Sequence, residues 1–245
     1  MMERIAAASP RFKARIAGVL YLIIIVAGIF AEVFVRERLV VHGDATATAQ
    51  NILAHELLYR WGFAAGIIML LCAIPLLLIL YDFFKVVNRS LSLLAVFFNL
   101  VSIAIEGVNL LNHFAPLILL GGGRYLSVFK AEQLHALAYL SLRLQSTGYD
   151  MSLAFFGCFC LFAGYLIFRS AFLPRIIGVL MAIAGLCYLT NSFTNFLAPQ
   201  FSKYLFPYIL LPAGVAELSL TLWLLVVGVN EQRWKEQAKA GFLTN

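Results

Sequence analysis

One apolar stretch of the sequence contains several polar residues. Residues 102–117 read SIAIEGVNLLNHFAPL, in which Glu106, Asn109 and His113 stand three or four residues apart. In a helix this spacing places a carboxylate, an amide and an imidazole on one face. Such groups could hold a cation, hydrogen-bond a solute or join helices. Because a charge at mid-membrane costs from about 2.5 kcal/mol upward, we expect this face to point away from lipid.

Other apolar segments supply polar partners for this face. The predicted ligand-binding residues are Glu32, His55, Arg60, Glu106, Asn109, His113, Asp150, Asn191 and Glu217. Together they predict an acid-lined cavity that opens outward, with Glu106, Asn109 and Glu217 at its floor. The alternative is that these residues only bind helices together, at about 0.6 to 2 kcal/mol per pair. Arg60 would then form a local ion pair with Glu56, four residues earlier.

The sequence predicts no catalytic residue, metal or cofactor. A zinc site of His55, His113, Glu106 and Asp150 is conceivable, but each of the four histidines stands alone on its segment. H-E-x-x-H, a nucleophile elbow, a phosphate loop and a dinucleotide fingerprint are all absent from the sequence. The four cysteines lie in apolar segments, and Cys158 and Cys160 would point to nearly opposite sides of a helix. We interpret them as packing residues.

The elements that position these residues follow from the composition. Of the 245 residues, 62% are hydrophobic and 12% are charged, against roughly 25% charged in soluble domains. A membrane helix needs about 20 apolar residues, and six segments qualify. The sequence therefore predicts an all-α polytopic membrane bundle, a single domain over 1–245, with spans at about 16–35, 61–82, 91–120, 150–168, 175–197 and 206–230.

The basic residues predict the orientation. With six spans, both termini and the loops after spans two and four share one side, which carries 11 of the 18 Lys and Arg residues. Cytoplasmic segments are enriched in these residues, so both termini are expected in the cytoplasm. The net charge of +6 then reflects topology and contact with membrane lipids. It does not indicate nucleic-acid binding.

Two outer segments and a weak repeat complete the prediction. Residues 130–146 are expected to form an interfacial amphipathic helix, or alternatively a lid over the cavity. Thr48 is expected to cap a helix that leads into span two. RIAGVL, RSLSLL and RIIGVL begin at Arg15, Arg89 and Arg175, which suggests three related helical hairpins.

Five segments together resemble a known family. They read RIAGVLYLIIIVAGIFAE, NILAHELLYRWGF, IEGVNLLNHFAPL, GYDMSLAFFGCFCLFAGYLIFRSAFLPRIIGVL and AELSLTLWLLVVGVN. In order and spacing they resemble the bacterial membrane family known as domain of unknown function 4386, over roughly residues 15–230. The resemblance implies a compact inner-membrane protein. It implies no reaction, substrate or site.

Three functions are compatible with these features. The leading hypothesis is a protein that binds or transports a small solute, a cation or a lipid head group in the outer cavity. The alternatives are a membrane enzyme that modifies a lipid, with or without a metal, and a structural or regulatory membrane subunit. A transporter needs hinges, which Pro75, Pro116 and Pro212 could supply. The sequence does not separate the three.

Overall fold

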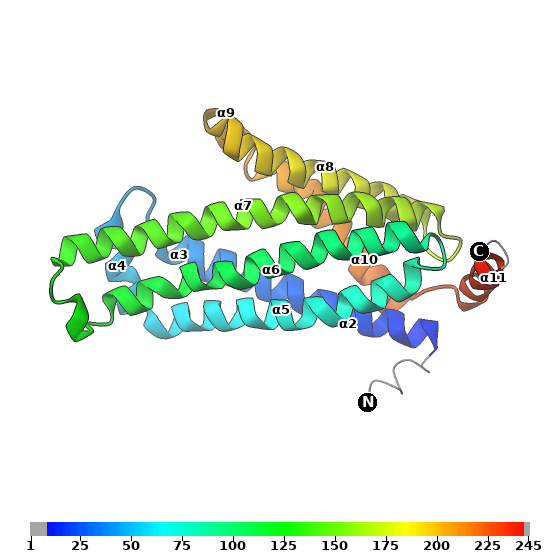
Figure 1. The fold of residues 1–245 in the computed structure, drawn as a ribbon, viewed down its shortest axis with the longest axis horizontal. Helices are drawn as coiled ribbons and strands as arrows, with labels where there is room; N and C mark the ends of the chain where they lie inside the picture. The colour runs from blue at the N-terminus through cyan, green and yellow to red at the C-terminus, as the bar shows by residue number, and fades with distance from the viewer. Residues whose placement is uncertain (1–8, 243–245) are drawn as a thin grey trace. The chain divides into compact units, whose positions relative to one another are not determined.

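The regular structure is helical throughout the part of the chain that a computed structural model describes, residues 9–242 (Figure 1). Six helices are long and apolar enough to cross a membrane: Pro10–Leu39, Glu56–Phe84, Arg89–Leu120, Ala131–Arg169, Arg175–Leu197 and Tyr208–Val226. The predicted all-α bundle of six spans is confirmed.

Two of the six spans are built from more than one helical segment. The first joins α2 (Pro10–Ile29), a π-helix η1 (Phe30–Arg36) and α3 (Glu37–Leu39), and the last joins η3 (Tyr208–Leu210) to α10 (Leu211–Val226). The four spans between them are α5 (Glu56–Phe84), α6 (Arg89–Leu120), α7 (Ala131–Arg169) and α8 (Arg175–Leu197). Shorter helices are α4 (Ala45–Ala54), η2 (Arg124–Leu126), α9 (Pro199–Leu205) and α11 (Glu231–Phe242).

Short polar side chains cap several helix starts. The side chain of Asp44 accepts a hydrogen bond from the Ala47 N–H at 2.8 Å and begins α4. Asn88 does the same for α6, and Asn230 for α11. The prediction that Thr48 caps α4 is wrong. Thr48 lies one turn inside the helix, and its hydroxyl accepts from the Val41 N–H instead, because Asp44 already satisfies the start of the helix.

The segment expected to lie on the membrane surface continues into span four. Residues 131–146 and 150–168 belong to one unbroken helix, α7 (Figure 1). The polar run between Gln145 and Asp150 suggested a break, but it contains no proline. A single glycine, Gly148, costs a helix only about 1 kcal/mol. Polarity alone therefore does not end this helix.

The chain divides into two compact units. Unit one comprises residues up to 22, residues 72–103 and the chain from residue 150 onward, while unit two comprises residues 23–71 and 104–149. The core of unit two is a buried apolar cluster of Val35, Leu39, Ile52, Tyr59 and Leu142.

Glycines bring two helices of unit one into backbone contact. Gly157 and Gly164 of α7 face Gly185 and Gly178 of α8, and a Cβ atom added at Gly164 would lie 2.7 Å from the Gly178 carbonyl oxygen. Small residues in membrane helices permit such close approach, which favours van der Waals packing. This seam fixes α7 against α8 and thereby holds Asp150, on α7, near the polar residues of α8.

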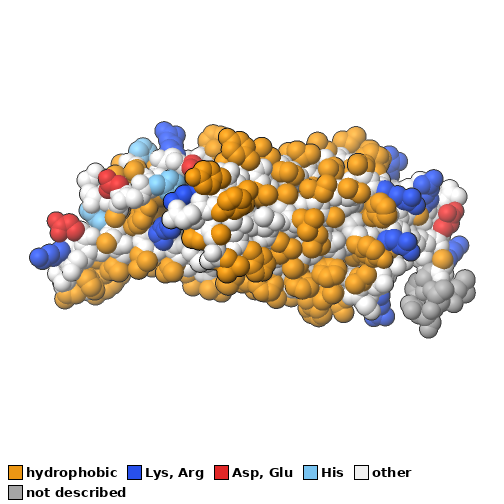
Figure 2. All heavy atoms as spheres, turned by 90° about the horizontal axis from the view of Figure 1, so that it is seen from above, with side chains coloured by type: hydrophobic (Ala, Val, Ile, Leu, Met, Phe, Trp, Pro, Cys, Tyr) orange, Lys and Arg blue, Asp and Glu red, His pale blue; other side chains and the backbone are white. Residues whose placement is uncertain are grey.

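Large apolar side chains are exposed on each spanning helix. Examples are Val26, Leu71, Leu111, Phe168, Leu186 and Val226. Figure 2 shows hydrophobic side chains over much of the visible surface. Exposed apolar area of this extent marks contact with lipid or with another protein, and together with six spans of sufficient length it defines a membrane protein.

Candidate functional site

The polar face of α6 points away from the lipid-facing surface, as predicted. Asn109 and His113 are 3% and 6% exposed, whereas their neighbours Val108 and Leu111 are each 68% exposed. The helix is therefore oriented so that aliphatic side chains meet lipid and polar ones are buried.

Asn109 is the centre of a hydrogen-bonded group in unit two. Its amide donates to the backbone oxygen of Gln145 on α7 at 2.8 Å, and its oxygen accepts from the Asn112 amide at 3.2 Å. A longer contact of 3.5 Å joins it to the half-buried Glu106 carboxylate. The Asn109 side chain fits between α6 and α7 because Gly148, which has no side chain, lies directly opposite on α7. Asn109 therefore joins α6 to α7.

His113 lies one turn further along the same face and packs against aromatic rings. Its ring stacks on Tyr59 of α5 with centroids 4.5 Å apart, and Phe63 stacks on it at 6.2 Å. The Tyr59 hydroxyl donates to the His113 backbone oxygen at 2.6 Å. The imidazole Nε2 is buried and has no hydrogen-bond partner among the described residues. A buried polar atom without a partner costs about 1–3 kcal/mol.

A π-helical turn contributes two charged side chains to unit two. Glu32 and Arg36 stand four residues apart on η1, with 3.6 Å between Nε and the carboxylate. Arg36 also donates to the side-chain oxygen of Gln145 at 2.7 Å. Through Gln145 this turn is linked to Asn109. Single π-helical turns are found frequently at functional sites.

Two of the predicted residues do not join this group. His55 is exposed at the end of α4, where its Nδ1 lies 3.1 Å from the Asn51 carbonyl oxygen. Arg60 pairs with Glu56 at 2.7 Å, and both side chains are about half exposed, at 50% and 47%. Arg60 thus forms the local ion pair that was the alternative interpretation.

The remaining predicted residues belong to unit one and are bonded to one another. The Asp150 carboxylate accepts from the Asn195 amide at 2.9 Å and from the Asn191 amide at 3.3 Å. The Glu217 carboxylate accepts from the Tyr188 hydroxyl. These contacts join α8 to α7 and to α10, so they fit the role of helix contacts.

Sequence reasoning omitted Arg36 and Gln145 from the site. A signal for Gln145 was available. Ala138, Leu142 and Gln145 follow the spacing of four and three residues that marks one helix face, and all three are buried. Arg36 carried no comparable signal, because an arginine at the end of a span is normally an anchor.

Within residues 9–242 the structure contains no group of three or more His, Cys, Asp and Glu side chains suited to a metal ion. Of the conceivable zinc set, His55 is exposed and Asp150 is bonded to the amides of α8. The arrangement therefore gives no support to a metal site built from these residues.

The fold and the buried polar contacts define a multi-pass α-helical membrane protein. Residues 16–228 match the family described as Domain of unknown function (DUF4386), and the chain belongs to that family. The resemblance found in the sequence is thereby confirmed. No curated protein and no solved structure matches the chain.

Proposed function

We propose that this protein binds or transports a small polar solute within unit two, in a bacterial inner membrane, with both termini cytoplasmic. The hydrogen-bonding groups around α6 would hold the solute: the His113 imidazole, the amides of Asn109 and Asn112, and the Glu106 carboxylate. Glu32 and Arg36 would stand beside them on the π-helical turn.

The buried Nε2 of His113 carries this proposal. Buried polar atoms are nearly always hydrogen-bonded, and the described residues offer this nitrogen no partner. A solute that hydrogen-bonds to Nε2 would satisfy it. The amides of Asn109 and Asn112 already have hydrogen-bond partners within the protein. Their role in the proposed site is therefore to orient the solute, whereas Nε2 requires the solute as its hydrogen-bond partner.

A polar solute is better supported than a cation. A cation site is favoured by several carboxylates that converge on one point, but Glu32 is paired with Arg36, and Glu217 is bonded to Tyr188 in unit one. Asp150 already accepts from two amides. Besides the Glu106 carboxylate, the groups of the site are the neutral amides of Asn109 and Asn112, the His113 imidazole and the Glu32–Arg36 pair, whose charges offset each other. Such a set suits an uncharged or zwitterionic molecule.

A thermal-shift screen tests the proposal. Purified protein is melted in the presence of amino acids, sugars, polyols and, in a separate arm, of monovalent and divalent cations. A solute at 100 times its dissociation constant stabilises the protein by about 2.7 kcal/mol. We expect one polar solute at least to raise the melting temperature of the parent protein and not that of His113→Phe, which keeps the ring stack and removes Nε2.

The matched control is Tyr59→Phe, which also keeps a ring but leaves Nε2 in place. It should retain the solute-dependent shift. A shift produced only by cations, an equal shift in parent and His113→Phe, or no shift in any arm would contradict the proposal. Glu106→Gln should melt close to the parent temperature yet retain less solute. Equal retention would remove Glu106 from the site.

The orientation is tested by labelling. In a background without the four native cysteines, Tyr125→Cys and Ala240→Cys are exposed in intact cells to an impermeant thiol reagent. We expect labelling at 125 and none at 240, because the basic residues concentrate on the side of the termini. The reverse pattern would overturn the outward-facing site.

A further inference from the structure

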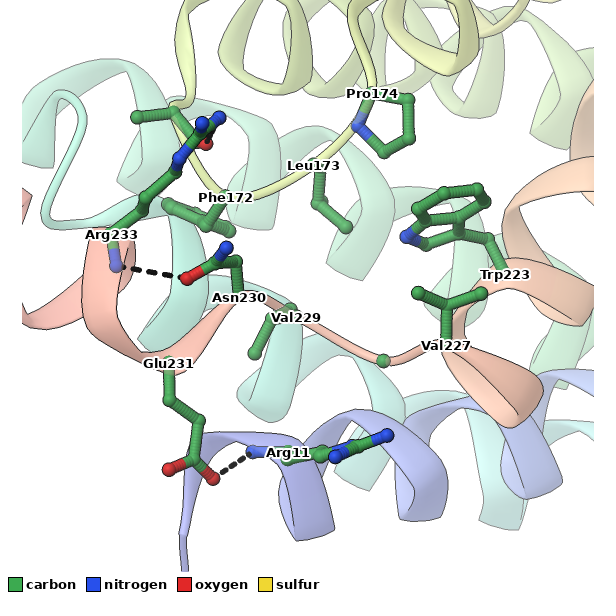
Figure 3. Close-up of a pocket in the computed structure, with 12 residues that line it drawn as sticks. Arg11, Phe172, Leu173, Pro174, Trp223, Val227, Val229, Asn230, Glu231 and Arg233 are labelled. Carbon is green, nitrogen blue, oxygen red and sulfur yellow. Dashed lines mark hydrogen bonds between the residues drawn. The ribbon is translucent and has the colours of Figure 1, made fainter.

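A second candidate site lies in unit one and shares no residue with the site around His113. An open pocket of about 650 Å³ lies between the start of α2, the connection between α7 and α8, the end of α10 and the start of α11 (Figure 3). This is within the range of about 300–1,000 Å³ typical of small-molecule sites. The pocket is lined by segments that all belong to the side predicted to be cytoplasmic.

The interior of the pocket is apolar with one polar donor. Phe172, Leu173 and Val229 are buried and form its inner surface. Trp223 lines the same space, and its indole N–H is buried without a hydrogen-bond partner among the described residues. A ligand that carries an acceptor oxygen would satisfy this donor.

The mouth of the pocket is basic. The guanidinium groups of Arg11 and Arg233 are exposed, and within residues 9–242 neither forms an ion pair. Among the described residues, the Arg233 guanidinium makes a single long contact, 3.5 Å from Nη1 to the Ala171 carbonyl oxygen. Guanidinium groups bind phosphate with two parallel hydrogen bonds. Glu231 is the single acidic residue of the lining.

Three helices begin at this pocket: α2 at Pro10, α8 at Arg175 and α11 at Glu231. Helix starts carry partial positive charge. One of these helix starts already holds an anionic oxygen, because the Glu231 carboxylate accepts from the Arg11 backbone N–H at 3.2 Å (Figure 3). The chain itself thus demonstrates that this position suits a negatively charged oxygen.

We propose that this pocket binds a phosphate group, supplied by the head group of an anionic phospholipid or by a free phosphate. The phosphate oxygens meet Arg11 and Arg233 at the mouth, and an ester oxygen or hydroxyl of the ligand meets the Trp223 indole. The glycerol portion of a lipid would pack on Phe172, Leu173 and Val229. The site is independent of the solute site in unit two.

The test measures binding to the full-length protein in detergent. The probes are short-chain phosphatidylglycerol, short-chain phosphatidylcholine and inorganic phosphate. We expect phosphatidylglycerol to bind to the parent protein. The double variant Arg11→Gln, Arg233→Gln should bind this lipid about tenfold more weakly or worse. The matched control is Lys235→Gln with Lys239→Gln, which removes the same charge from exposed positions of α11 outside the pocket and should leave affinity unchanged.

The three probes distinguish a lipid head group from free phosphate as the ligand. Competition by inorganic phosphate at the same site identifies the phosphate itself as the ligand. Binding of phosphatidylglycerol without such competition identifies the anionic lipid head group. Equal weakening by the two double variants would show general attraction to basic residues and overturn the proposal. So would the absence of binding by both phosphatidylglycerol and inorganic phosphate, or binding of zwitterionic phosphatidylcholine as tight as that of anionic phosphatidylglycerol.

A gain of affinity gives a second, independent measurement. Glu231→Gln keeps a side-chain oxygen that can accept from the Arg11 N–H but removes the negative charge from the pocket. We expect phosphate binding to tighten several-fold, because like charge no longer opposes the ligand. A purely structural role of these residues predicts unchanged or weaker binding. If the double arginine variant does not fold, the affinity of Glu231→Gln decides whether the pocket binds phosphate.

Discussion

Substitution of Gly148 by alanine is expected to disrupt the contact between α6 and α7 in unit two. A Cβ atom at this position would lie 2.4 Å from Oδ1 and 2.6 Å from Cγ of Asn109. The Asn109 side chain must therefore move and lose its bonds to Gln145 and Asn112. Hydrogen bonds between membrane helices average about 0.6 kcal/mol and reach about 1.7 kcal/mol. Overpacking adds about 1–3 kcal/mol.

These two effects amount to about 2–5 kcal/mol of destabilisation. Alanine recovers up to about 1 kcal/mol through its higher helix propensity, so the net loss should be about 1–4 kcal/mol. Unfolding in mixed micelles, followed by circular dichroism, measures it. Gly214→Ala is the matched control, because a Cβ atom there has nothing within 4 Å. It should be neutral or slightly stabilising.

A double-mutant cycle isolates the cause. Asn109→Ala removes the atoms that the new methyl group would strike, so the pair Gly148→Ala and Asn109→Ala should be more stable than the sum of the two single effects. Contacting residues give interaction energies of about 0.5–3 kcal/mol. Additive effects, or equal effects of alanine at positions 148 and 214, would refute the close packing of Asn109 against Gly148.

Two further predictions concern stability and use the same unfolding assay. Arg60→Gln should change the free energy of unfolding by less than about 0.5 kcal/mol, because its ion pair with Glu56 is half exposed; a loss above about 1 kcal/mol would show a deeper role. Gly164→Val should destabilise by about 3 kcal/mol or more, since even its Cβ atom would lie 2.7 Å from the Gly178 carbonyl oxygen; a melting temperature equal to that of the parent would contradict the glycine seam.

Burial on α6 could be predicted from the sequence because the cost of placing polar groups in lipid leaves few alternatives. The spacing of Glu106, Asn109 and His113 located one face, and that same cost placed the face inside. The six spans followed from length and hydropathy for the same reason. Where the cost of placing polar groups in lipid dominates, the spacing of polar and apolar residues is sufficient to predict which helix face is buried.

The hydrogen-bond and ion-pair partners of individual side chains could not be predicted in this way. Arg60 pairs with Glu56 one turn away, whereas Arg36 contacts Gln145 on another helix. Yet both arginines lie at a boundary of an apolar segment, Arg36 at its end and Arg60 at its start. The π-helical turn that carries Arg36 has no known sequence signature in this chain. The pocket in unit one could not be predicted because its residues come from four separate segments, each of which contains only an ordinary basic or aromatic anchor.

The central claim, that the buried group around His113 holds a small polar solute, is tested most directly by an experimental structure of the protein isolated with its native lipids. We expect non-protein density larger than a water molecule within hydrogen-bonding distance of His113 Nε2, with further contacts to the amides of Asn109 or Asn112. If Nε2 is bonded to a protein group or to a single water molecule, with no other density beside it, no solute is held at this position.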